Sequence, residues 1–173
     1  MKPFKKLKLV YTPDYDFKLI GIVSTAANYE LCHWLNVMLK LDLSRSNDIE
    51  YVKKDSFTAA NVLISFAIFE YHDEILKRDF HLLSNTAFSE AQSTTTTPQL
   101  FEKNEYNAVK YYLAEEAKEI HYFLKITGHL SKKESKELYV QLRKLSCITV
   151  FKIIHLATFK SKELFIIDNT HTK

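Results

Sequence analysis

Residues 17–40 read FKLIGIVSTAANYELCHWLNVMLK, and the spacing of their apolar residues predicts a strand followed by a helix. The segment 17–23 is almost wholly apolar, which is typical of a buried strand. In 28–40 the apolar residues recur at helical spacing, and Asn28 is placed to cap the first turn. This apolar stripe consists of Leu31, Trp34, Leu35, Met38 and Leu39. We therefore expect an amphipathic helix whose stripe, Trp34 included, packs into the core.

The C-terminal third predicts a second unit of helix and strand. Ser131 and Glu134 have the spacing of a capping box, in which each side chain accepts a hydrogen bond from the other residue's backbone. Leucines at helical spacing then indicate a helix over 132–145. The apolar run that follows predicts a strand at 148–156, and a last short strand is expected at 164–167.

Short apolar runs in the middle of the chain predict further strands. The runs 61–70 and 76–83 are separated by a polar turn, which indicates a hairpin. The segment 106–126 combines helical spacing with strand-like flanks. We interpret it as a strand, one helical turn and a strand, and leave open a helix over 106–120. Additional strands are expected at 5–11 and 49–53.

One low-complexity segment, STTTTP at 93–98, interrupts the strands. We expect a mobile surface loop over about 86–105, inside a single domain that spans 1–173. The predicted fold class is α+β, with a largely antiparallel sheet of about six to eight strands and two main helices, 28–40 and 132–145.

Glycine is scarce, since the 173 residues include two glycines where an average chain would carry about twelve. A phosphate-binding Walker loop, a dinucleotide-binding G-x-G-x-x-G and a G-x-S-x-G nucleophile elbow all need more glycines in one place. We expect Gly21, inside a strand, to mark a bulge or a close backbone approach. Gly128, after a strand, is expected to form a turn into the second helix.

Charge and cysteine content favour a mildly basic cytoplasmic protein over a secreted or dedicated nucleic-acid-binding one. The net charge is +3, and the basic N-terminus is not followed by the apolar segment of a signal peptide. No run is long enough to span a bilayer. The two cysteines, Cys32 and Cys147, are far apart in apolar stretches, which indicates buried free thiols.

The segment 15–50 carries a resemblance to a known family. It reads YDFKLIGIVS at 15–24, YELCHWLN at 29–36, LKLDLSR at 39–45 and DIE at 48–50. With FHLLSN at 80–85, these stretches resemble the IPExxxVDY family of small, uncharacterised Bacteroidota proteins, over most of residues 5–156. The resemblance implies a bacterial cytoplasmic protein and supplies no activity.

The motif that names this family is altered in the chain. The corresponding stretch is AEEAKEIHY at 114–122, which keeps Glu116, Tyr122 and the aliphatic Ile120. The proline and aspartate positions of the motif hold Glu115 and His121. The resemblance therefore singles out Glu116 and Tyr122 as site candidates.

Catalytic, cofactor and metal sites are not indicated by the residue pattern, and we expect none of them. The seven histidines lack the convergent spacing of metal ligands, and HDE at 72–74 is read as a solvated turn. Cys32 and His33 are adjacent on a helix, about 100° apart, so they cannot form a nucleophile–base dyad.

Arg45 is a notable residue because the chain contains three arginines and twenty-one lysines. A planar, bidentate guanidinium is the property that lysine lacks. Asp48 is three residues away, and Asn36 lies on the polar face of the preceding helix. We favour a structural clamp at the helix exit, with an anion or partner site as the alternative.

These observations predict a non-enzymatic protein-interaction or regulatory module that contacts a protein partner or a second copy of itself through a sheet edge or a helix face. An RNA-associated protein is the first alternative, based on lysine clusters at 5–8 and 132–136. An enzyme with an unrecognised site is the second. A membrane or metal partner is not expected.

Overall fold

The computed structural model describes residues 15–54, 61–89 and 109–167, and the statements below concern these ranges. The strands are β1 (Phe17–Ser24), β2 (Ser44–Arg45), β3 (Ile49–Lys54), β4 (Asn61–Phe66), β5 (Ile68–Asp73), β6 (Arg78–Ser84), β7 (Thr86–Ser89), β8 (Val109–Tyr112), β9 (Tyr122–Thr127) and β10 (Ile148–Ile154). The helices are α1 (Asn28–Leu39), α2 (Lys132–Lys144) and the 3-10 helices η1 (Glu115–Ala117) and η2 (Lys160–Phe165). The expected strand 5–11 and most of the expected loop 86–105 lie outside these ranges.

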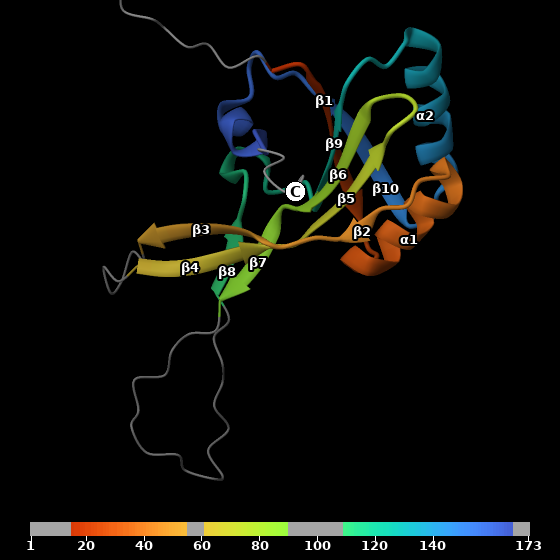
Figure 1. Cartoon of the computed structure of the whole chain (residues 1–173). Coiled ribbons are helices and arrows are strands. Elements are labelled where there is room, and N and C mark those ends of the chain that lie inside the picture. The colour runs from red at the N-terminus through yellow and green to blue at the C-terminus, as the bar shows by residue number, and fades with distance from the viewer. Residues whose placement is uncertain (1–14, 55–60, 90–108, 168–173) are drawn as a thin grey trace, which may run out of the picture.

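A six-stranded antiparallel sheet is the centre of the fold (Figure 1). Its strand order is β10-β1-β9-β6-β5-β2, and every neighbouring pair is antiparallel. The two remaining strand pairs, β3–β4 and β7–β8, form separate two-stranded ribbons. The predicted α+β class, with a largely antiparallel sheet and two main helices, is confirmed.

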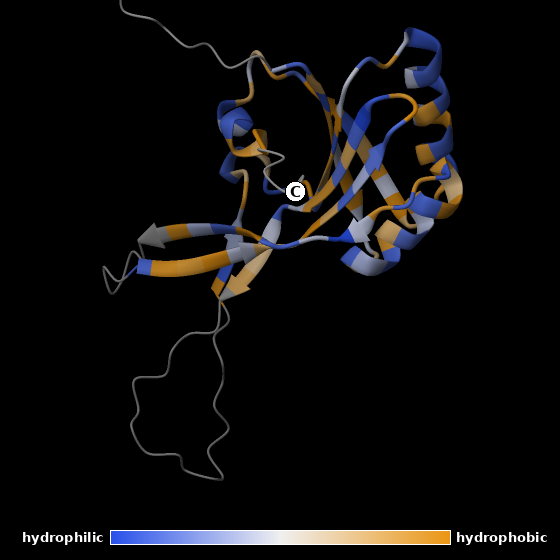
Figure 2. Ribbon diagram, viewed as in Figure 1, coloured by the Kyte–Doolittle hydropathy of each residue, from blue (hydrophilic) through white to orange (hydrophobic). Residues whose placement is uncertain are grey.

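Both α-helices cover one face of the sheet, here called the helix face (Figure 1). The Ser131–Glu134 capping box is present and starts α2 as predicted. Apolar residues of the helices pack against apolar residues of the strands. Figure 2 shows apolar and polar residues alternating in colour along both helices. The most deeply buried residues of this core are Ile20, Ile22, Leu31, Leu35, Leu82, Leu124, Ile126 and Leu142.

The opposite face, here called the second face, is covered by η1, η2 and the two ribbons. Its core contains an aromatic cluster in which the ring centroids of Phe123 and Phe165 are 4.8 Å apart. Phe159 completes the cluster, 6.0 Å from Phe123. The segment 164–167, expected to be a strand, instead belongs in part to η2. That expectation was wrong because Phe165 is the last residue of a six-residue 3-10 helix and is buried in this core.

The expected strand 61–70 is divided, because the chain bends at Ala67 and changes partner from β3 to β6. A second bend at Asn85 sends the chain from β6 into β7, so residues 86–89 form a strand where a loop was expected. Asn85 is fully buried, and its side chain donates to the carbonyls of Ala117 and Ile120 at 2.9 and 2.8 Å. Its Oδ1 accepts from the amide of Ala114 at 2.8 Å. This one amide holds η1 against the bend.

Segment 109–127 forms a strand, one 3-10 turn and a strand, which confirms the preferred interpretation and excludes a helix there. Two local expectations for α1 were wrong. Ala27, not Asn28, holds the cap position, because the Ala27 carbonyl accepts the first helical bond from Leu31 at 2.9 Å. Trp34 lies at the border of the apolar stripe and is 43% exposed, because Leu31 and Leu35 take the inward positions.

The two glycines have different roles. Gly128 forms the predicted turn, whereas Gly21 marks neither a bulge nor a close backbone approach, because a side chain packs against it. A Cβ at Gly21 would lie 2.4 Å from Cδ1 of Ile120, so this strand residue permits close packing of the segment after η1. Gly128 has a φ of +94°, and a Cβ there would lie 2.7 Å from the Lys77 carbonyl oxygen. It forms the turn between β9 and α2.

None of the helices in the described ranges is long and apolar enough to cross a bilayer.

Candidate interaction site

The two edges of the main sheet differ in length and in cover. At one edge, β2 contributes two residues that pair with β5. At the other edge, the seven-residue strand β10 pairs with β1 on one side and has no strand on its outer side within the described ranges. β10 reads ITVFKII, with one charge and neither proline nor glycine. An edge strand of this length and composition is a template for pairing with another chain.

The side chains of β10 are only partly covered. Val150 and Ile153 are 55% and 43% exposed, although both are apolar. Phe151 points to the helix face, where Tyr139 of α2 stacks on it with ring centroids 5.8 Å apart. Lys152 is exposed and lies opposite Gly21 of β1. The outer edge therefore offers both unpaired backbone and apolar side chains.

Helix α2 lines this edge on the helix face with cations. The guanidinium of Arg143 lies 6.0 Å from the centroid of the Phe151 ring. Lys136 is seven residues before Arg143, two helical turns away on the same side of α2. Both side chains are exposed. We call Val150, Lys152, Ile153, Lys136 and Arg143 the edge site.

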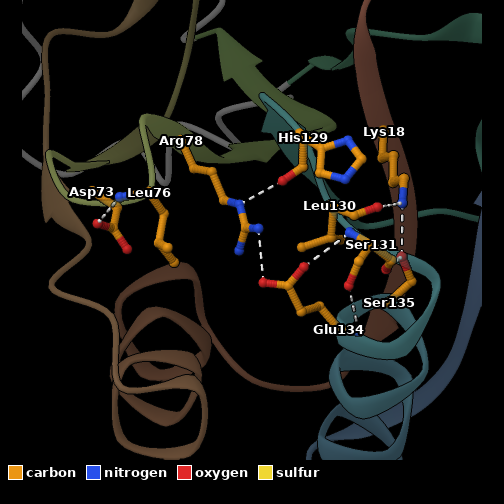
Figure 3. Close-up of polar contacts among 9 residues, drawn as sticks. All are labelled: Lys18, Asp73, Leu76, Arg78, His129, Leu130, Ser131, Glu134 and Ser135. Atoms are coloured by element: carbon orange, nitrogen blue, oxygen red, sulfur yellow. Dashed lines mark hydrogen bonds and ion pairs between the residues drawn. The ribbon is translucent and has the colours of Figure 1, made fainter.

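A network at the start of α2 fixes the position of this helix on the sheet (Figure 3). Arg78 is buried, and its Nε donates to the carbonyl of His129 at 2.7 Å while Nη2 binds Glu134 Oε1 at 2.7 Å. Glu134 Oε2 accepts from the amide of Ser131 at 2.9 Å. Hydrogen bonds from Ser131 and then from Arg78 lower the pKa of Glu134 to about 2. The carboxylate is thus ionised at neutral pH and joins β6 to α2.

Lys18 of β1 supports the same helix start. Its ammonium donates to the carbonyl of Leu130 at 2.9 Å and to Ser135 Oγ at 2.7 Å (Figure 3). Ser135 Oγ in turn donates to the carbonyl of Ser131 at 2.8 Å. With these contacts the first turn of α2 is bonded to two different strands, which holds in place the helix that carries Lys136 and Arg143.

The predicted residues around Arg45 are partly brought together. Arg45 forms an ion pair with Asp48, and its Nη1 donates to the carbonyl of Ile68 at 3.0 Å. The guanidinium lies 5.4 Å from the centroid of the Phe69 ring. Asn36 makes a separate contact, a pair of hydrogen bonds with the backbone of Leu43 at 2.9 and 2.8 Å. The Asn36 contacts hold the segment between α1 and β2, and the Arg45 contacts hold the segment between β2 and β3 against β5.

The two residues singled out by the family motif lie apart from each other. Tyr122 donates to the carbonyl of Ala26 at 2.8 Å, just before α1. Glu116 accepts from the amide and the hydroxyl of Ser161 at 2.7 and 2.6 Å, at the start of η2. Burial acts to raise the pKa of Glu116, but these hydrogen bonds outweigh it and the pKa is lowered. Each residue therefore fixes a helix start from another element.

His81 is a buried polar residue in the second face that the sequence analysis did not identify. It is 3% exposed, lies opposite Lys125 in the β6–β9 register, and its Nδ1 has no hydrogen-bond partner in the described part of the chain. Burial and the ammonium of Lys125 lower the pKa of His81 from 6.5 to about 4. His81 is therefore neutral at pH 7.

Other features of the described residues do not form a recognisable reaction centre. A hollow of about 180 Å³ between β3, β4, β8 and η2 has mainly apolar walls, with Glu115 as its one carboxylate. Burial raises the pKa of both thiols, Cys32 and Cys147, which are unpaired. Within residues 15–54, 61–89 and 109–167, three or more histidine, cysteine or acidic side chains do not converge as metal ligands.

Sequence analysis missed Arg78 and the edge position of β10. The scarcity of arginine, which drew attention to Arg45, applies equally to Arg78 and was a usable signal.

Comparison of the chain with protein-family models, curated proteins and solved structures finds no match.

Proposed function

We propose that the protein is a non-enzymatic protein-interaction or regulatory module whose contact surface is the edge site at β10. The observation that carries this proposal is a seven-residue edge strand without a neighbour on its outer side in the described ranges. An extended peptide added to such an edge gains backbone hydrogen bonds along its length. Exposed Val150 and Ile153 provide side-chain contacts on both faces of the added strand.

The rigid attachment of α2 supports the same proposal. A docked segment loses conformational freedom, and a preorganised surface reduces the cost of ordering on the receiving side. Arg78, Glu134 and Lys18 tie the start of α2 to the sheet, as described above. The helix and β10 therefore present one fixed surface.

Membership in the IPExxxVDY family and a cytoplasmic location are kept as parts of the proposal, on the basis of the sequence in 15–50 and 80–85. An RNA-associated function is the alternative outcome of the experiment below. It would act through exposed lysines, and binding would weaken steeply as salt is raised.

The experiment compares two variants that add equal charge at two exposed apolar surfaces. Val150→Asp/Ile153→Asp alters the edge site, and Val52→Asp/Leu63→Asp alters the β3–β4 ribbon, where the side chains are 67% and 56% exposed. Aspartate is depleted in strands, and charges on an edge strand oppose pairing. Circular dichroism and thermal melting first establish that both variants are folded.

Each protein is then used for affinity capture from native lysate, and each captured partner is added back to the pure chain. We expect the edge variant to lose partners that the ribbon variant retains, with slower amide hydrogen exchange at 148–154 on binding. Equal capture by both variants would contradict the proposal. A salt-dependent gel shift with RNA, unaffected by the edge variant, would favour the alternative.

A further inference from the structure

Three cations flank β10 along its length, while the carboxylate of Glu30 acts on Cys147, just before the strand begins. Arg143 lies on the helix face of this edge, and Lys136 is on the same side of α2 two turns earlier. Lys152 extends from the strand itself toward the second face. The ion pairs of the described residues do not include any of the three. A strand added at this edge would therefore have a cation beside it on each face.

The acidic residues of α2 do not neutralise these cations. α2 contains two glutamates, and Glu134 is bound to Arg78 on the side facing β6. Glu137 pairs with Lys133 at 4.0 Å. The side of α2 that carries Lys136 and Arg143 is thus basic along two turns.

We propose that the segment recognised at the edge site is an extended, acidic stretch of another protein, in which carboxylates alternate with apolar side chains. This proposal rests on the proposed function of β10 as a strand-addition site. Charge complementarity carries it, because opposite charges across an interface favour the correct partner and like charges oppose the wrong one. Because successive residues of a strand point to opposite faces, alternation places the carboxylates on the helix face, beside the cations of α2, and the apolar side chains on the second face, beside Val150.

A second copy of the chain fits this edge less well. Antiparallel pairing of two β10 strands around a two-fold axis normal to the sheet would place both α2 helices on the same face, side by side. Lys136 and Arg143 of one copy would then face the same basic side of the other. The repulsion opposes self-pairing, whereas an acidic segment removes it.

The probes are labelled ten-residue peptides of alternating valine and glutamate, with matched peptides that carry glutamine or lysine in place of glutamate. Binding to the full chain is measured by fluorescence anisotropy at low and high salt. We expect the glutamate peptide to bind about tenfold more tightly than the glutamine peptide at low salt, and the difference to shrink at high salt. The lysine peptide is expected to bind most weakly.

Variants locate the preference. Lys136→Gln/Arg143→Gln should reduce the preference for glutamate over glutamine to less than about threefold, since the charges that produce it are gone. The matched control, Lys110→Gln/Lys118→Gln, removes two exposed cations near Tyr112, away from β10, and should keep the full preference. A glutamate peptide with two consecutive N-methylated central residues tests strand pairing. Consecutive N–H groups of an extended peptide point to opposite sides, so this peptide lacks one backbone donor whichever side faces β10.

The outcomes separate the two proposals. Equal, salt-independent binding of the glutamate and glutamine peptides, with slower hydrogen exchange at 148–154, would overturn the acidic preference and leave strand addition intact. Absence of binding by every peptide, together with unchanged exchange at 148–154, would overturn both. A dimer in sedimentation at micromolar concentration that dissociates in Val150→Asp/Ile153→Asp would show that a second copy occupies the edge, and would overturn the choice of partner.

Discussion

Strand β6 presents Arg78 and His81 to opposite faces of one sheet, and the two faces differ in how they satisfy a buried polar side chain. On the helix face, Arg78 has a carbonyl and a carboxylate as partners. On the second face, His81 is equally buried, yet its Nδ1 has no partner among the described residues. The turn before α2 offers Arg78 the His129 carbonyl, and the first turn of α2 offers it the Glu134 carboxylate, whereas the middle of a sheet has already used its backbone groups.

Substitution of Arg78 tests how much the buried polar contacts of the helix face stabilise the fold. Arg78→Ala should lower the free energy of unfolding by about 3 kcal/mol, because it removes two charge-assisted hydrogen bonds, to the His129 carbonyl and to the partly exposed Glu134 carboxylate, and leaves the carbonyl without its donor. Urea unfolding at pH 7 measures the change. A loss below about 1 kcal/mol would show that the α2 start does not depend on this residue.

Low pH tests the second face, because it favours the protonated form of His81, which the buried site disfavours. Its pKa is about 4 in the folded chain and 6.5 ordinarily, so the unfolded chain binds more protons between these values. Stability is therefore complete above pH 6.5 and should fall by about 2–3 kcal/mol as the pH drops to 4. Urea unfolding across this range measures the loss.

His81→Leu is the control for that experiment. Replacing an unsatisfied buried polar group by an apolar one of similar shape should leave stability at pH 7 within about 1 kcal/mol of the original. The slope between pH 6.5 and 4 should flatten in this variant. The pKa of Glu134 is about 2, so its contribution is lost only between pH 4.5 and 2, and that slope should remain. An unchanged slope above pH 4.5 would contradict the role of His81.

Gly128 tests the turn that brings the helix face together. Gly128→Ala places a Cβ at a φ of +94° and 2.7 Å from the Lys77 carbonyl oxygen, and should cost about 2 kcal/mol. Thermal melting detects the shift. A matched Gly21→Ala should cost less, since the nearest atom there is the flexible end of the Ile120 side chain. The reverse order would contradict this account of the two glycines.

Arg45 supplies the smallest effect. Its ion-pair partner Asp48 is three residues later in the chain. Both side chains are substantially exposed, at 44% for Arg45 and 32% for Asp48. Arg45→Lys should change the free energy of unfolding by less than about 1 kcal/mol. Capture of partners from lysate should also be unchanged, and loss of a partner would instead identify Arg45 as an interaction residue.

Local patterns of the sequence were sufficient for most individual elements. The apolar stripe of α1, the capping box of α2 and the strand-like apolar runs of β1, β9 and β10 depend on residues a few positions apart. The division of 61–70 was not predictable in this way, because its apolar residues continue through Ala67. The partner strand changes there, and that is a long-range event.

The candidate site shows the same limit. A strand at 148–156 and a lysine cluster at 132–136 were both evident from the residues. That β10 lies at an edge follows from its pairing with β1, more than 120 positions away in the chain. The buried role of Arg78 likewise depends on Glu134, 56 residues later.

The sequence by itself determined the class of the fold and the scarcity of glycine that excludes phosphate-binding loops, because periodicity and backbone freedom are local properties. Only the tertiary structure decided which strand was left at the edge, which arginine was buried and which histidine lost its partner. Strand order and burial depend on contacts between distant segments, and no window of neighbouring residues contains them.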